Sequence, residues 1–168
     1  MELIFPAMEH KQAALDFWQE HVDHGEPWIH GSAGLINAES YESWLAAVIA
    51  AQTEVPPGLV TSTTYFAIDE GRIVGTISIR HKLNDALMKL GGHIGYGVRP
   101  SARRKGYGTA MLTLALAKCR TLGITRALVT CDKDNAASAG TITKNGGVLE
   151  NEVTQDDGAI TRRYWISL

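Results

Sequence analysis

A glycine-containing turn between an expected strand and an expected long helix is the feature that most constrains this chain. The turn is Arg103–Thr109, with the sequence Arg-Arg-Lys-Gly-Tyr-Gly-Thr, and it follows a strand expected at 93–99 and opens a helix expected at 108–122. A β-rich run at 124–131 completes a strand-helix-strand unit. Because parallel strands need a crossover of this kind, the sequence predicts a sheet with at least one parallel pair.

The same turn has the composition of an anion site. Glycines let the backbone approach an anion, the first amides of a helix have no intrahelical partner, and the helix dipole favours negative charge there. The alternative is a plain basic turn whose side chains are solvated. We expect a phosphate group to contact the whole segment, namely Arg103, Arg104, Lys105, Gly106, Tyr107, Gly108 and Thr109.

The spacing of apolar residues and the turn signals predict the remaining elements. Ser40 is the expected N-cap of its helix, and Ser43 offers it no capping-box partner. The order of elements predicts an α/β protein whose mixed sheet carries helices on both faces. Strands are expected at 2–5, 63–68, 72–80, 148–153 and 160–166, helices at 9–24, 40–51 and 135–144, and one ambiguous segment, a short helix at most, at 83–90.

Length and charge bound the class of protein. The 168 residues suit one domain with its own core, and a net charge of −2 argues against a protein that coats nucleic acid. No run approaches the roughly 20 apolar residues of a membrane span, and the start of the chain lacks a signal-peptide pattern. We therefore expect a soluble, cytoplasmic protein without a nucleic-acid or membrane partner. Its two cysteines, Cys119 and Cys131, are expected to be buried free thiols.

The spacing in the turn excludes two familiar phosphate motifs. A Walker A loop places its lysine after the second glycine, whereas Lys105 precedes Gly106 here. A dinucleotide fingerprint needs a third glycine where this chain has Met111. The pattern Arg103-x-x-Gly106-x-Gly108, preceded by Val98-Arg99-Pro100, instead resembles the acetyl-coenzyme A motif of the GNAT acetyltransferase superfamily.

A second motif lies at the separation that this superfamily shows. It consists of Asp132-Lys133-Asp134-Asn135-x-x-Ser138 followed by Lys144-Asn145-Gly146-Gly147. The resemblance implies one GNAT domain over residues 1–168, with a helical acceptor-side half at 1–58 and an acetyl-coenzyme A-binding core at 60–168. It also implies a mostly antiparallel mixed sheet whose central parallel pair splays apart.

The resemblance further implies how the cofactor, acetyl-coenzyme A or coenzyme A, is held. The pantetheine arm pairs with the opened strand, where Val98 offers its amide and carbonyl and the backbone amide of Tyr96 faces the thioester oxygen. Asn135 is either the N-cap of its helix or a partner of the pantetheine. Ser138 lies one turn further on the same side of that helix.

Catalytic acid and base groups are less clearly marked. Most members of the superfamily place a tyrosine seven residues after the asparagine, but this chain has Ile142. The departing thiolate of coenzyme A could take its proton from Ser138 or from a water. It could also leave without an acid, because a thiolate is a tolerable leaving group. His93 is the candidate base, with a buried structural histidine as the alternative. Glu26 is the candidate partner of the acceptor ammonium, with a simple surface loop as the alternative.

The sequence as a whole predicts an acetyl-coenzyme A-dependent N-acetyltransferase acting on a primary amine of a small molecule or peptide. Direct transfer is expected, since neither cysteine lies in an electropositive turn. The alternative is a coenzyme A-binding or sensing domain without catalysis. No metal site is expected, because His21, His24 and His30 lack further ligands at a standard spacing. A homodimer through an exposed final strand is a further expectation.

Overall fold

One parallel pair interrupts an otherwise antiparallel sheet of seven strands, in the order β1-β2-β3-β4-β5-β7-β6. The computed structural model describes all residues, 1–168. Only β4 and β5 run parallel, which confirms the expected crossover. The strands are β1 (Glu2–Ile4), β2 (Ser62–Asp69), β3 (Arg72–Arg80), β4 (Ile94–Val98), β5 (Arg126–Asp132), β6 (Val148–Thr154) and β7 (Ile160–Ser167).

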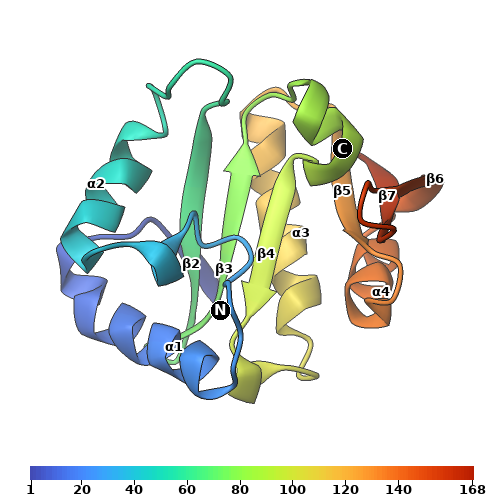
Figure 1. The fold of residues 1–168 in the computed structure, drawn as a ribbon. Helices are drawn as coiled ribbons and strands as arrows, with labels where there is room; N and C mark the ends of the chain where they lie inside the picture. Colours follow the sequence, from blue (N-terminus) through green and yellow to red (C-terminus); the bar gives the residue numbers. More distant parts are fainter.

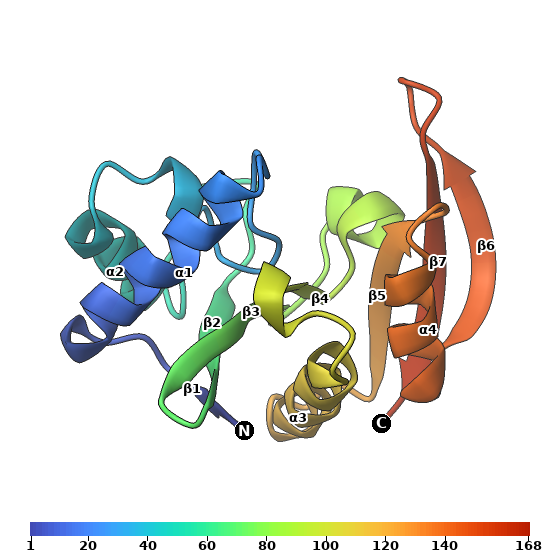
Figure 2. The same ribbon diagram turned by 90° about the horizontal axis from the view of Figure 1, so that it is seen from below.

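Helices cover both faces of this sheet, as expected (Figures 1 and 2). The helices α1 (Lys11–Asp23) and α2 (Tyr41–Ala50) pack on one face, over β2 and β3. The helix α3 (Tyr107–Thr121) packs on the opposite face, and α4 (Ala136–Lys144) contacts both α3 and β5. Each face therefore has its own apolar core, one around Phe17 and Trp44 and one around Met111 and Leu112.

Two details differ from the expectations, and the ambiguous segment at 83–90 is short and helical. Ser43 does act as a capping-box partner, since its hydroxyl accepts from the Ser40 amide while Ser40 Oγ accepts from the Ser43 amide. The ambiguous segment ends in a π-helical turn at Leu87–Gly91. The final strand β7 lies between β5 and β6, so the edge strands are β1 and β6, and the expectation that an exposed final strand pairs two chains is wrong. No helix is long and apolar enough to cross a membrane.

The loop after α1 lies directly on the backbone of β4. Thr76 Oγ1 donates to the His30 carbonyl at 3.0 Å, and Trp44 Nε1 donates to the Ser32 carbonyl at 2.8 Å. A Cβ on Gly97 would lie 2.7 Å from the His30 oxygen, and a Cβ on Gly31 would overlap the Gly95 carbonyl. The glycines of β4 thus admit the chain's own loop at this face, which fixes the loop against the strand.

This contact predicts unequal costs for two similar substitutions. Gly25 and Gly31 both adopt positive φ angles, +69° and +73°, but a Cβ on Gly25 would meet nothing within 4 Å. We expect Gly25→Ala to lower the free energy of unfolding by about 1–2 kcal/mol through backbone strain alone. Gly31→Ala should lower the free energy of unfolding by about 1–3 kcal/mol more than Gly25→Ala does, because its methyl group overlaps β4.

Urea unfolding followed by tryptophan fluorescence measures both values. Equal losses for the two variants would show that the loop does not lie on β4 in solution.

Candidate functional site

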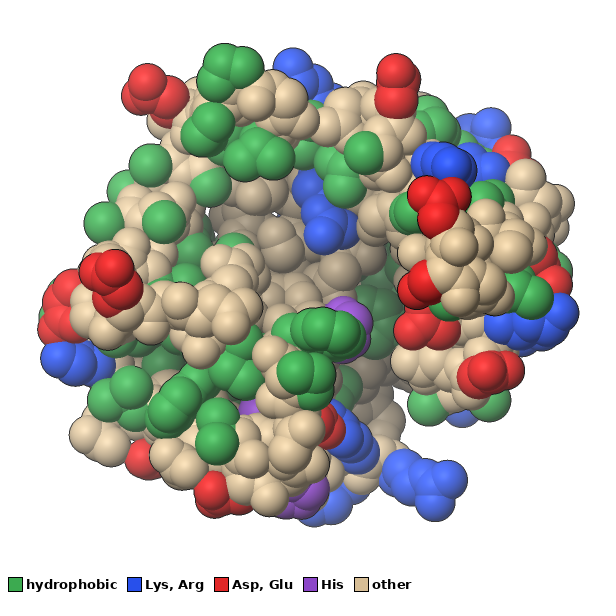
Figure 3. Space-filling view, in the orientation of Figure 1, with side chains coloured by type: hydrophobic (Ala, Val, Ile, Leu, Met, Phe, Trp, Pro, Cys, Tyr) green, Lys and Arg blue, Asp and Glu red, His purple; other side chains and the backbone are tan.

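A deep cleft opens where β4 and β5 separate. Its volume is about 1050 Å³, and its walls come from β4, β5, the turn before α3, the start of α4 and the loop after α1. Figure 3 shows the hollow near the middle of one face, with basic side chains and a histidine around it. The cleft is large enough for an extended ligand of several hundred daltons.

The two parallel strands pair at a single position. Ile94 lies opposite Val129, and no pairing with β5 continues beyond it. Two hydrogen bonds show which residues of β4 face β3. The Arg80 amide donates to the His93 carbonyl, and the Arg99 amide donates to the Val74 carbonyl. Alternate residues of an antiparallel strand face their partner. The backbone groups of Tyr96 and Val98 therefore point away from β3, into the cleft.

The turn before α3 presents unpaired backbone amides at one end of this cleft. Gly106 is the N-cap, with φ +87°, and the helix has neither a side-chain cap nor an acidic residue in its first turn. None of the amides of residues 104–109 donates to a protein acceptor. An uncapped helix start attracts an anion through these amides and the helix dipole.

The side chains of the turn take different directions. Arg104, Gly106, Gly108 and Thr109 line the cleft. Lys105 lies outside it, in a smaller depression beside Asp69 and Glu70. Tyr107 also lines the cleft, but its hydroxyl donates to Asp69 at 2.7 Å.

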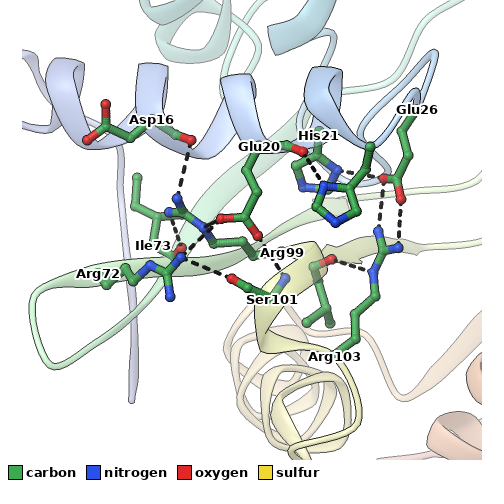
Figure 4. A network of polar contacts seen from close by, with 11 residues as sticks. Asp16, Glu20, His21, Glu26, Arg72, Ile73, Arg99, Ser101 and Arg103 are labelled. Atoms are coloured by element: carbon green, nitrogen blue, oxygen red, sulfur yellow. Dashed lines mark hydrogen bonds and ion pairs between the residues drawn. The ribbon is translucent and has the colours of Figure 1, made fainter.

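Arg103 is held by the loop after α1. Its guanidinium donates to both carboxylate oxygens of Glu26, at 2.6 and 2.8 Å, and to the Val98 carbonyl at 3.1 Å (Figure 4). Glu26 also contacts His21 Nδ1 at 2.7 Å. The bonds from Arg103 are the main cause of a lowered pKa of Glu26. Glu26 therefore lines the cleft as a carboxylate that joins the loop to the turn.

A second carboxylate fastens α1 to the same region (Figure 4). Glu20 accepts hydrogen bonds from the Ser101 amide, the buried Arg99 guanidinium and Arg72. Burial opposes ionisation of Glu20, but the hydrogen bonds from Ser101 and Arg99 prevail and lower its pKa to about 2. The segment between β4 and α3 is thus tied to α1 through Glu20 and to the loop after α1 through Glu26.

On the other wall, α4 meets β4 through two hydroxyl groups. Tyr96 Oη lies 2.8 Å from Ser138 Oγ, and both residues line the cleft. Burial raises the pKa of Tyr96, so its phenol stays protonated at neutral pH. Asn135 is the N-cap of α4, because its Oδ1 accepts from the Ser138 amide at 2.9 Å. Ile142, in contrast, is fully buried in the core.

His93 does not line the cleft. It is 8% exposed, and its Nδ1 accepts the Leu128 amide at 3.0 Å. Burial, with a smaller contribution from Arg80, lowers its pKa. This geometry is that of the structural alternative, and His93 is no longer our candidate base. Of the six histidines in the sequence, His30 alone lines the cleft.

Comparison with known proteins identifies the fold. The family model described as "Acetyltransferase (GNAT) family" matches residues 35–146. The chain belongs to this GNAT family. None of the curated proteins compared with the sequence matches it.

Solved GNAT structures align with nearly the whole chain. The microcin C7 self-immunity acetyltransferase MccE, in complex with acetyl-CoA and AMP, has a TM-score of 0.71 and 19% identity over 99% of this chain and 91% of its own. An acetyltransferase of Salmonella typhimurium that modifies the N-terminal serine of ribosomal protein L7/L12 has a TM-score of 0.70 and 18% identity over 99% and 94%. YncA of the same organism, a structure with acetyl-CoA, has a TM-score of 0.67 and 16% identity. Its alignment covers 99% of this chain and 93% of YncA. These likenesses show the GNAT fold.

Three side chains of this GNAT cleft had no role in our interpretation of the sequence. The Tyr96 phenol, the Cys131 thiol and the Arg80 guanidinium all line it. Strand alternation places the side chain of Tyr96 on the α3 face, but its partner Ser138 lies 42 residues away, beyond the reach of local patterns. Burial raises the pKa of Cys131, so its thiol is a poor nucleophile at neutral pH.

Proposed function

We propose that this GNAT protein is an acetyl-coenzyme A-dependent N-acetyltransferase that transfers the acetyl group directly to a primary amine. The observation that carries the proposal is the line of unpaired backbone groups along one cleft. It runs from the backbone groups of Tyr96 and the amide of Val98 on β4, whose carbonyl accepts from Arg103, to the free amides of residues 104–109 at the start of α3. Extended amide groups of a pantetheine fit the strand edge, and a pyrophosphate fits the helix start.

Different residues of the cleft are suited to different steps of the proposed reaction. When bound, acetyl-coenzyme A supplies an activated acetyl thioester. The Tyr96 amide donates toward the cleft and is our candidate for stabilising negative charge on a carbonyl oxygen. Asn135 uses its Oδ1 as a cap, which leaves its Nδ2 as the group for a ligand. Arg103 reaches a phosphate only by giving up part of its contact with Glu26.

A pair of hydroxyls takes the place of the usual tyrosine on α4. Because the Tyr96 phenol stays protonated and contacts Ser138 Oγ, the two groups hold a proton in the cleft. We propose Ser138 as the proton donor to the departing thiolate and Tyr96 as its supporting partner. Direct transfer fits the raised pKa of Cys131, which disfavours an acetylated cysteine.

A second candidate is a coenzyme A-binding domain without catalysis. Its supporting observation is Ile142, which occupies the usual tyrosine position and is fully buried, so no acidic group replaces it there. Both candidates predict coenzyme A binding, and only the first predicts turnover.

Acceptor-dependent release of free thiol therefore separates the two candidates. The protein is incubated with acetyl-coenzyme A and a panel of primary amines, and thiol is followed with a chromogenic disulfide. We expect release above the amine-free rate, with Cys131→Ala retaining it because no acetyl-cysteine forms. Binding of coenzyme A without any amine-dependent release would favour the second candidate, and loss of release in Cys131→Ala would contradict direct transfer.

The assignment of the phosphate turn is tested at the two ends of α3. Gly106 and Gly123 both have positive φ and open space around a Cβ, but only Gly106 lies at the helix start. Gly106→Glu places a carboxylate where the pyrophosphate is expected, and should weaken coenzyme A binding by about tenfold or more through charge repulsion and strain. Gly123→Glu, the matched control, should bind as the wild type does.

Calorimetric titration with coenzyme A gives both dissociation constants. Equal values for Gly106→Glu and wild type would place the phosphate elsewhere.

Removal of either hydroxyl should slow the reaction. General acids typically contribute about 10²–10⁴-fold, and a thiolate needs less help, so we expect Ser138→Ala and Tyr96→Phe to lower kcat about tenfold with little change in KM for acetyl-coenzyme A. Thr143→Ala on the exposed side of α4 is the control. Steady-state kinetics of thiol release measures the effect, and unchanged kcat in both variants would exclude the pair as the acid.

A further inference from the structure

Arg80 places a cation on the acceptor side of the cleft. It ends β3, and its side chain lies across Gly95 of β4, with both Nη atoms 3.4 Å from the position of a Cβ on that glycine. Nη1 donates to the carbonyls of Gly91 and Gly92 at 3.0 and 3.3 Å. A methyl group at position 95 would be in van der Waals contact with the guanidinium, so Arg80 covers this face of Gly95.

The charge of Arg80 has no carboxylate partner in the protein, and its acceptors are the Gly91 and Gly92 carbonyls at the end of the π-helical turn. It forms no ion pair with a carboxylate, and Nη2 and Nε donate to no protein acceptor. It is the only arginine that is neither exposed nor paired with a carboxylate. Burial lowers its pKa, which shows that the surroundings disfavour the cation. Partly buried charges are normally compensated by a counter-charge, so this part of the cleft suits an anionic group.

The phosphates of coenzyme A are poorly placed to supply that anion. In the proposed mode they bind at residues 104–109, beyond the Val98 end of β4, whereas Arg80 lies over Gly95 near the opposite end. The loop that carries His30 and Gly31 covers the same face of β4 as Arg80. Arg80 therefore belongs to the space left for the acceptor.

The position of Arg80 also limits the size of the acceptor. Gly95 directly precedes Tyr96, and adjacent residues of a strand are only about 3.3 Å apart. One small molecule can therefore place an anionic group at Arg80 and, a few bonds away, an amine beside the Tyr96 backbone. A guanidinium fork with free donors suits a carboxylate, which it binds through two hydrogen bonds.

We propose that Arg80 binds the carboxylate of the acceptor, so that the substrate is a small amino acid rather than a simple amine. This inference rests on the proposed function. Trp28, which is 61% exposed at the rim of the cleft, is positioned to contact the side chain of such an amino acid.

Matched pairs of ligands test the inference by binding alone. The protein, saturated with coenzyme A, is titrated calorimetrically with glycine, L-alanine, L-methionine and L-phenylalanine and with their amides, which keep the amine but lack the carboxylate. At least one acid should bind about 10–100-fold more tightly than its amide, the range expected for charge-assisted hydrogen bonds. Aminomethylphosphonate is included, and tighter binding of this compound than of every carboxylate would overturn the choice of a carboxylate.

Variants then assign the preference to Arg80. Arg80→Gln should abolish the preference for the acid and Arg80→Lys should keep part of it, while Arg120→Gln, at an exposed position on α3, should leave it unchanged. Thermal melting shows whether Arg80→Gln still folds, because the side chain also holds Gly91 and Gly92. If it does not fold, the comparison of acids with amides on the wild type and on Arg80→Lys decides.

Equal binding of acids and amides, or no binding of any acid, would overturn the inference. The two proposals fail differently in the thiol-release assay. If the amides are acetylated as readily as the acids, the transferase function stands and the role of Arg80 falls. If acids bind through Arg80 but no acceptor releases thiol, the carboxylate site stands and the transferase function falls.

Discussion

The whole site depends on one strand whose two edges have different partners. The groups of β4 that face β3 are paired along the strand, while those on the other edge pair with β5 only at Ile94. Unpaired backbone groups are costly when buried, so a strand of this kind persists only where solvent or a ligand reaches it. The separation of β4 from β5 thus produces both the cleft and the donors that line it.

Two carboxylates of the N-terminal half hold the cleft together from outside the sheet. Glu20 fastens α1 to the segment after β4, and Glu26 joins the loop after α1 to Arg103 in the turn before α3 (Figure 4). In the proposed function Glu20 has a structural role, whereas Glu26 lies between the acceptor end and the phosphate end of the cleft. A ligand that draws Arg103 toward a phosphate therefore also changes the surroundings of Glu26.

Local sequence patterns predicted the order of all strands and long helices, because each element carries its own periodicity, cap or turn. The glycine turn at 106–108 likewise marked the start of α3. Contacts between distant segments were not predictable in this way. His93 had a suitable ordinary pKa, but its buried bond to Leu128 removes it from the cleft. Arg80 looked like the end of a hairpin strand, and its importance appears only when Gly95 is seen beneath it.

Hydrogen-deuterium exchange with and without coenzyme A tests the central claim most directly. If the opened strand edge and the start of α3 form the cofactor site, coenzyme A should slow exchange in peptides that cover residues 94–109, since amides of Tyr96, Val98 and residues 104–109 acquire acceptors. Peptides from β6 and β7, at the far side of the sheet, should exchange as before. Unchanged exchange at 94–109 with saturating coenzyme A, or protection confined to another region, would contradict the account.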